Sequence, residues 1–123
     1  MPKTYKDLEI YQLSYVLAVE VHKFSLKLPA HELYEEGGQL RRSSKGIVSC
    51  IAEGYGRKRY KAEFIRFLVF AHASCDESIT HLSLIKDIYE GLKEETGSLI
   101  NSYEELGGKI NRFIDYVEKH WKN

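Results

Sequence analysis

Proline is scarce in this chain of 123 residues, where it occurs only as Pro2 and Pro29. Because proline interrupts helices and central strands, its scarcity permits long regular segments on either side of Pro29. The strict alternation of apolar and polar residues that marks half-exposed strands is also absent. Apolar residues recur instead three and four positions apart, a spacing that predicts helices.

Long hydrophobic runs are missing as well. No apolar stretch approaches the roughly 18 residues that a membrane-spanning helix needs. The opening segment MPKTYKDLEIYQLS lacks the continuous apolar core of a signal peptide. We therefore expect a cytoplasmic protein without a membrane partner. The apolar fraction of 43% is that of a folded globular protein, and we expect residues 1–123 to form a single domain.

Only two cysteines are present, Cys50 and Cys75, and their spacing matches no metal-binding or redox motif. A thiol buried among apolar side chains stays protonated and unreactive, so neither is expected to be a nucleophile. The Glu-x-x-His pairs of carboxylate-bridged metal centres do not occur. The segment GYGRKR lacks the lysine–serine ending of a phosphate-binding loop. The sequence thus predicts no catalytic residue, no metal, no cofactor and no small-molecule substrate.

Four segments have the periodicity of amphipathic helices. We expect helices at about residues 7–28, 39–53, 61–92 and 99–120, with 30–38 and 93–98 as polar connectors. Thr4 or Asp7 can cap the first helix, and Pro29 should end it. Four amphipathic helices joined by short connectors predict an all-α fold, an antiparallel up-and-down four-helix bundle.

The expected third helix is apolar on two faces. One stripe includes Phe64, Leu68 and Leu82. A second set lies largely on the opposite side and consists of Val69, Phe70, Ala73, Leu84 and Ile88. A helix that is apolar on two faces must be covered on both. One four-helix bundle covers only one of them well, so the second face predicts a homo-oligomer.

Charge is unevenly distributed along the chain. Eighteen basic and eighteen acidic residues give a formal net charge of zero. The segment from Gln39 to Arg66 nevertheless holds eight of the basic residues and only two of the acidic ones. The rest of the chain is correspondingly acidic. A basic segment in an acidic background indicates a polyanion as a partner.

The segment Gln39–Arg57, which begins QLRR and ends IAEGYGR, resembles the four-helix-bundle proteins linked to 23S rRNA intervening sequences. The stretches YKDLEIYQLS, EFIRFL and ASCDESITHL extend the resemblance over nearly the whole chain. The resemblance implies an all-helical bundle and, in similar proteins, a ring-shaped homopentamer. It also implies a fold similar to that of nucleic-acid-binding accessory proteins of diversity-generating retroelements. It implies no settled activity, since the family name describes where some of the genes lie.

Two positions depart from that family. Cys50 stands where the family usually has asparagine, which predicts that a polar contact made in similar proteins is missing here. Tyr60 stands where the family often has a small hydroxyl residue, so the third helix is expected to lack a side-chain cap.

The junction between the second and third helices is the predicted nucleic-acid interface, where cations would contact phosphates and two tyrosines would stack on unpaired bases. The residues assigned to it are Arg41, Lys45, Tyr55, Arg57, Lys58, Arg59, Tyr60 and Lys61. The alternative interpretation is a solvated basic loop without a nucleic-acid partner, which pairs with the acidic remainder of the protein.

Arg42 and Glu53 are eleven residues apart and share a face of the second helix. Together with Glu77, they are predicted to form a structural ion network rather than a catalytic carboxylate site, because no nucleophile accompanies them. Two functions stay open at this point. One is a non-enzymatic oligomer that binds the backbone of RNA or DNA, and the other is a protein-interaction or scaffold module without nucleic-acid contact.

Overall fold

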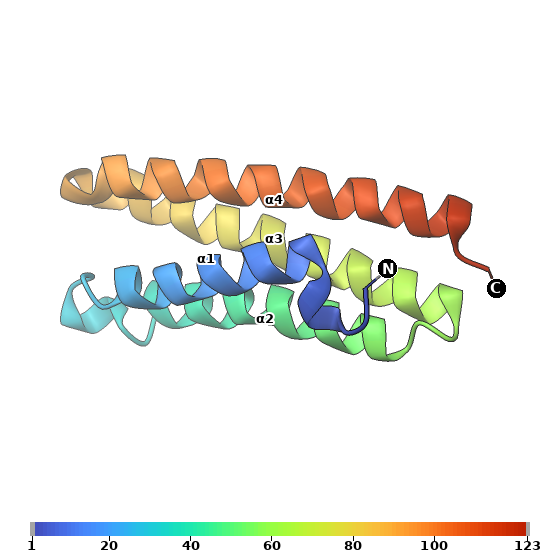
Figure 1. The fold of residues 1–123 in the computed structure, drawn as a ribbon. Coiled ribbons are helices and arrows are strands. Elements are labelled where there is room, and N and C mark those ends of the chain that lie inside the picture. Colours follow the sequence, from blue (N-terminus) through green and yellow to red (C-terminus); the bar gives the residue numbers. More distant parts are fainter. Residues whose placement is uncertain (1, 123) are drawn as a thin grey trace.

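The computed structural model describes residues 2–122, in which the secondary structure is entirely helical. The four α-helices are α1 (Glu9–Ser25), α2 (Glu36–Gly56), α3 (Lys61–Ile88) and α4 (Lys93–His120). Three short 3-10 helices accompany them, η1 (Tyr5–Asp7), η2 (Ala30–Glu32) and η3 (Glu90–Leu92). The α-helices lie side by side and successive ones are joined at alternate ends (Figure 1). The predicted all-α four-helix bundle is thus confirmed.

The helices follow a simple packing order. α2 packs against both α1 and α3, α3 packs against α4, and α1 contacts α4 more sparsely. α1 and α3 make no contact of their own, so they occupy diagonal corners of the bundle. None of the helices that the structure describes has both the length and the apolar character needed to cross a bilayer.

The N-terminal cap involves both residues that the sequence offered for it. The Thr4 hydroxyl accepts a hydrogen bond from the Lys6 amide at 3.1 Å, and the Asp7 carboxylate accepts one from the Thr4 amide, also at 3.1 Å. This reciprocal pair caps η1 rather than α1. The first helix was therefore predicted to start about two residues early, because Leu8 is extended and α1 begins only at Glu9.

The expected connector at residues 93–98 is wrong, because these residues form the first turns of α4. Glu94 and Glu95 favour that start, since carboxylates stabilise the positive end of the helix dipole. α2 likewise begins at Glu36 rather than near Gln39. The expected third helix is broken by Tyr89, whose extended backbone separates α3 from η3. At the start of α3 Tyr60 makes no side-chain cap, as the sequence predicted.

The core consists of the stripes predicted from helical spacing. Leu40, Ile47 and Ile51 of α2 are fully buried, and so are Phe64 and Leu82 of α3. The second apolar set on α3 is indeed left uncovered within one chain. Its largest members, Val69, Phe70, Leu84 and Ile88, are all exposed.

α2 and α3 approach each other closely because small residues line their contact. The Ser43 and Ser78 hydroxyls share a hydrogen bond of 2.8 Å across the interface. A Cβ atom added at Gly54 would lie only 2.9 Å from the Phe67 Cβ, closer than real Cβ contacts allow. Gly54 is therefore required by packing, since a methyl group there would push the two helices apart.

At the opposite end of the bundle, polar side chains fasten the connection between α1 and α2. The Tyr89 hydroxyl donates a 2.6 Å hydrogen bond to the Glu32 carboxylate, and the His81 ring lies 2.8 Å from the Glu36 carboxylate. The bond from Tyr89 lowers the pKa of Glu32 below its usual range. The same carboxylate raises the pKa of Tyr89 to about 12.

Substituting Gly54 with alanine should destabilise the bundle by about 1–3 kcal/mol, because the new methyl group overpacks the contact with Phe67. Chemical denaturation of wild type and variant measures the difference. Gly56→Ala is the matched control, since nothing lies within 4 Å of a Cβ built at Gly56. Equal stability of the two variants would contradict the close-packing role of Gly54.

Replacing Tyr89 with phenylalanine removes the donor that keeps the pKa of Glu32 low. A depressed carboxyl pKa stabilises the fold above the unfolded-state pKa, and this contribution is lost as the pH falls through the folded-state value. The variant should therefore unfold at a lower temperature than wild type at neutral pH. The two melting temperatures should converge as the pH falls below the folded-state pKa of Glu32. A difference in melting temperature that does not change with pH would show that the Tyr89 hydroxyl does not stabilise the fold through the ionised Glu32 carboxylate.

Candidate nucleic-acid interface

The turn between α2 and α3 is short and ordered. The Arg57 amide donates to the Gly54 carbonyl at 3.0 Å, and the Lys58 amide donates to the Tyr55 carbonyl at 3.1 Å. A further bond of 2.9 Å runs from the Tyr60 amide to the Arg57 carbonyl. The side chains of Arg57, Lys58 and Tyr60 are exposed on this turn. Because the backbone is fixed by these bonds, the cations are presented from a defined position at the end of the bundle.

Arg57 is held against the surface of α3. Its guanidinium lies 4.7 Å from the centre of the Phe67 ring and 3.5 Å from the Glu63 carboxylate. Glu63 also pairs with Arg66 at 3.3 Å. One carboxylate thus serves two guanidinium groups, so the cluster retains positive charge. Ion pairs as exposed as these contribute little to stability and leave both guanidinium groups accessible to another anion.

The other cations of the turn differ in how firmly they are held. The Lys58 ammonium lies 4.4 Å from the centre of the Tyr55 ring. The Lys61 ammonium donates a 2.6 Å hydrogen bond to the Glu118 carbonyl near the end of α4. A cation is stabilised there by the negative end of the helix dipole. Arg59 is exposed, and within residues 2–122 it makes no ion pair or side-chain hydrogen bond.

Tyr55 does not have the position that was predicted for it. The residue is only 6% exposed, and its ring packs edge-on against Phe64 with 6.1 Å between ring centres. Its hydroxyl donates to the Pro2 carbonyl at 3.2 Å. A base cannot stack on this ring unless the ring leaves the core, so the stacking role assigned to Tyr55 is not supported. Tyr60, which is 60% exposed, keeps a ring that a base can reach.

The structure also separates Arg41 and Lys45 from the turn. They precede Arg57 by about 24 Å and about 18 Å along α2, at 1.5 Å per residue. The Arg41 guanidinium is occupied in holding the connection between α1 and α2, because it donates to the Ser25 hydroxyl at 2.8 Å and to the Leu33 carbonyl at 2.6 Å. Lys45 is exposed beside α1 instead. Neither residue lies in one cluster with the turn.

Two lysines that the sequence analysis did not include lie near the same end. The Trp121 indole donates a 3.2 Å hydrogen bond to the Lys58 carbonyl and packs edge-on against Phe64 at 5.3 Å. The chain end is thereby fixed beside the α2–α3 turn (Figure 1), which brings exposed Lys119 and Lys122 to this end. The only signal in the sequence was their position in and after the last turn of α4. Hereafter the basic end denotes Arg57, Lys58, Arg59, Lys61, Lys119 and Lys122.

The predicted ion network does not form within one chain. The Arg42 guanidinium donates to the Gln39 amide oxygen at 3.0 Å, and Glu77 lies 3.5 Å from the His81 ring. Across the part of the chain that the structure describes, no ion pair joins Arg42, Glu53 and Glu77. His81 sits instead between the carboxylates of Glu77 and Glu36, far along the bundle from Glu53.

The chemistry of the cysteines fits the expectation of inert thiols. Cys75 is fully buried and donates to the Tyr103 carbonyl at 3.1 Å. Burial raises the pKa of the Cys75 thiol to about 12, and partial burial also raises that of Cys50. Residues 2–122 hold no group of three or more His, Cys, Asp or Glu side chains placed to bind a metal ion.

A protein-family model matches most of the chain. A family model described as 23S rRNA-intervening sequence protein matches residues 6–112, and no curated protein matches the chain. The matched range includes α1, α2, α3, the α2–α3 turn and α4 as far as Arg112, so it ends before Lys119, Trp121 and Lys122. Since this range is most of the sequence, the chain belongs to the family of 23S rRNA-intervening sequence proteins.

Proposed function

We propose that this protein is a non-enzymatic, oligomeric binder of RNA or DNA, and that its basic end contacts the phosphate backbone. The observation that supports the proposal is the gathering of six cations, five of them exposed, from two distant chain segments at one end of the bundle. Within residues 2–122, Glu63 is the one carboxylate that pairs with the turn, and it is shared between Arg57 and Arg66. The remaining charge is available to a polyanion.

Counterion release would supply most of the binding free energy. Six cations in contact with phosphates give a slope of about −5 in log affinity against log salt on duplex DNA, and about −4 on a single strand. Such contacts carry no sequence information, so selectivity between sequences would be low. Tyr60 beside the cations favours a strand whose bases are unpaired, because only such bases can stack on an exposed ring.

Self-association belongs to the same proposal. The resemblance to this family implies a homopentameric ring, which would repeat the basic end once per subunit. Repetition concentrates the positive field and lets one nucleic-acid molecule contact several subunits, so that weak contacts add up to tight binding.

A scaffold without nucleic-acid contact is the second candidate. The pairing of Arg57 with Glu63 shows that the turn can satisfy a carboxylate, and an acidic surface of another protein could take the same place. Both candidates predict binding of an anionic partner, and they differ in whether nucleic acid is that partner.

Removing two cations from the basic end should weaken nucleic-acid binding more than removing two cations elsewhere. In the variant Lys58→Ala/Arg59→Ala the salt slope should fall by about two, one unit for each lost phosphate contact. Fluorescence anisotropy with a labelled oligonucleotide over a salt series measures both affinity and slope.

The matched control is Lys27→Ala/Lys93→Ala, which removes the same charge from exposed lysines at the opposite end. It should keep the wild-type slope. No binding by wild type at low salt, or equal losses in the two variants, would reject the basic end as the interface.

Substituting Tyr60 with alanine should weaken binding to single-stranded nucleic acid by about 1–3 kcal/mol and leave duplex binding nearly unchanged. An unpaired base of a single strand would lose the tyrosine ring on which it stacks. Every cation that contacts phosphates would remain, so duplex binding is kept. Tyr34→Ala is the matched control, because Tyr34 is an exposed tyrosine in the connection at the far end of the bundle. Equal effects on single strands and duplexes would indicate that Tyr60 does not stack.

A further inference from the structure

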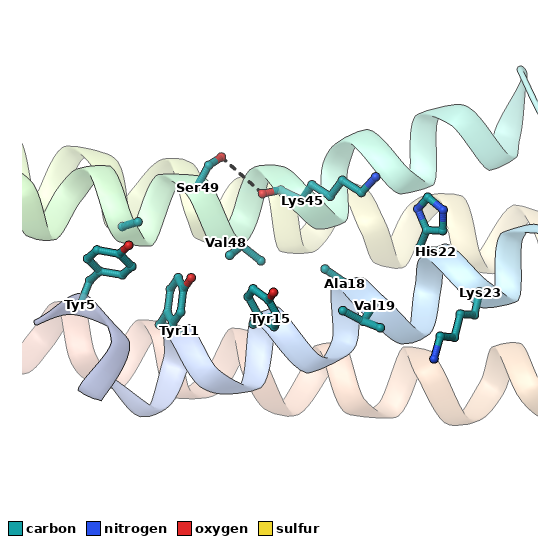
Figure 2. A pocket seen from close by; sticks show the side chains of 11 residues that line it. Tyr5, Tyr11, Tyr15, Ala18, Val19, His22, Lys23, Lys45, Val48 and Ser49 are labelled. Atoms are coloured by element: carbon teal, nitrogen blue, oxygen red, sulfur yellow. Dashed lines mark hydrogen bonds between the residues drawn. The ribbon is translucent and has the colours of Figure 1, made fainter.

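An apolar groove of about 430 Å³ opens between α1 and α2. Tyr5, Tyr11 and Tyr15 lie along one end of it, as Figure 2 shows, and His22 and Lys45 lie at the other. Among the residues that the structure describes, those lining the groove include no acidic one. The groove is thus an uncovered apolar surface whose charged groups are exclusively cationic.

A second uncovered apolar surface runs along the outer side of α3. Val69, Phe70 and Leu84 are exposed there, between 41% and 48% of their full accessible area. The charged residues among them near the middle of the helix are Asp76 and Glu77, both exposed. Arg66 is exposed nearer the start of α3, where its guanidinium lies 5.2 Å from the centre of the Phe70 ring. This face therefore has the apolar character of the groove, and it is acidic along its middle.

The two surfaces cannot meet within one chain. α1 and α3 occupy diagonal corners and make no contact with each other, so the outer side of α3 points away from the groove. Each surface must be covered by something else or remain in water. Exposed apolar patches of this kind, edged by charge, are typical of protein interfaces.

We infer that the outer face of α3 from one copy of this chain docks in the α1–α2 groove of the next copy. This inference rests on the self-association proposed above and names the two surfaces that meet. The contact is heterologous, because different surfaces of the two copies pair. Such contacts generate closed rings or open filaments, depending on the rotation between neighbours.

The charges favour this pairing over its alternatives. Asp76 and Glu77 of one copy would face Lys23 and Lys45 of the next, with Leu84 buried against the apolar floor. Two grooves placed face to face would give these lysines no carboxylate to pair with, whichever way the grooves ran. Two α3 faces packed together would bring Asp76 and Glu77 of one copy close to the same residues of the other. This holds for parallel and antiparallel helices, because both residues lie near the middle of α3. Like charges at an interface disfavour association.

Two single variants test the pairing. Val19→Glu places a carboxylate in the groove, and Leu84→Lys places an ammonium group on α3. Both side chains are exposed, so folding should persist, which circular dichroism verifies. Each variant alone should dissociate, with its dissociation constant for self-association raised roughly tenfold or more. Sedimentation velocity measures the masses.

Mixing the two variants provides the decisive measurement. The Val19→Glu protein retains an intact α3 face and the Leu84→Lys protein retains an intact groove, so one contact between them survives. The mixture should form complexes of at least twice the mass of a single chain, because the other possible contact would bring the two introduced charges, which are of opposite sign, together. A pairing of like surfaces predicts instead that one of the two variants still self-associates alone and that mixing adds nothing.

Val16→Glu is the matched control, since Val16 is an exposed valine of α1 that does not line this groove. It should retain the wild-type mass. A wild-type protein that associates while Val19→Glu and Leu84→Lys leave its mass unchanged would overturn this inference alone. A monomeric wild-type protein would overturn the proposed self-association as well. Nucleic-acid binding is read separately by anisotropy, because neither variant alters the basic end.

Discussion

The approach of α2 to α3 at their shared end controls where the charged groups of this protein lie. Gly54 has no side chain at the point where an added Cβ would come within 2.9 Å of Phe67, so the helices close on each other there. The chain then needs only the residues from Arg57 to Tyr60 to reverse direction. Three of those four residues are cations, and a tight turn has no interior in which to bury them. Close packing thereby concentrates charge at the end of the bundle.

The position of Trp121 depends on the same close approach of α2 and α3, and Trp121 brings further cations to this end of the bundle. Its indole reaches the Lys58 carbonyl and packs on Phe64, which is itself buried between α2 and α4. A wider α2–α3 junction would move Lys58 and Phe64 apart and leave the indole with one partner at most. The end of the chain, with Lys119 and Lys122, is thus tied to the turn by a residue that contributes no charge.

The sequence predicted the fold well because helical period and burial coincide in this chain. Leu40, Ile47 and Ile51 are buried as their spacing required, and the uncovered face of α3 was also foreseen. The candidate site was predicted less well, because charge counted along the sequence does not show which cations are close together in the folded protein. Arg41 belongs to the same basic segment as Arg57, but its guanidinium is used by Ser25 and Leu33, which come from distant positions. The stacking role predicted for Tyr55 was wrong for a related reason, since the burial of this residue depends on its contacts with Phe64 and Pro2.

The two proposals constrain each other through the direction of the helices. The groove and the outer face of α3 follow helices that run the length of the bundle, whereas the basic end includes the α2–α3 turn at one tip of the bundle. Figure 1 shows that turn at the end of the bundle. Contacts through the sides therefore leave the tip open to a ligand. If the copies close into a ring by rotation about one axis, every tip lies at the same height along that axis. The cations of all subunits would then form one continuous rim, a surface to which a long flexible polyanion is better matched than a compact acidic protein.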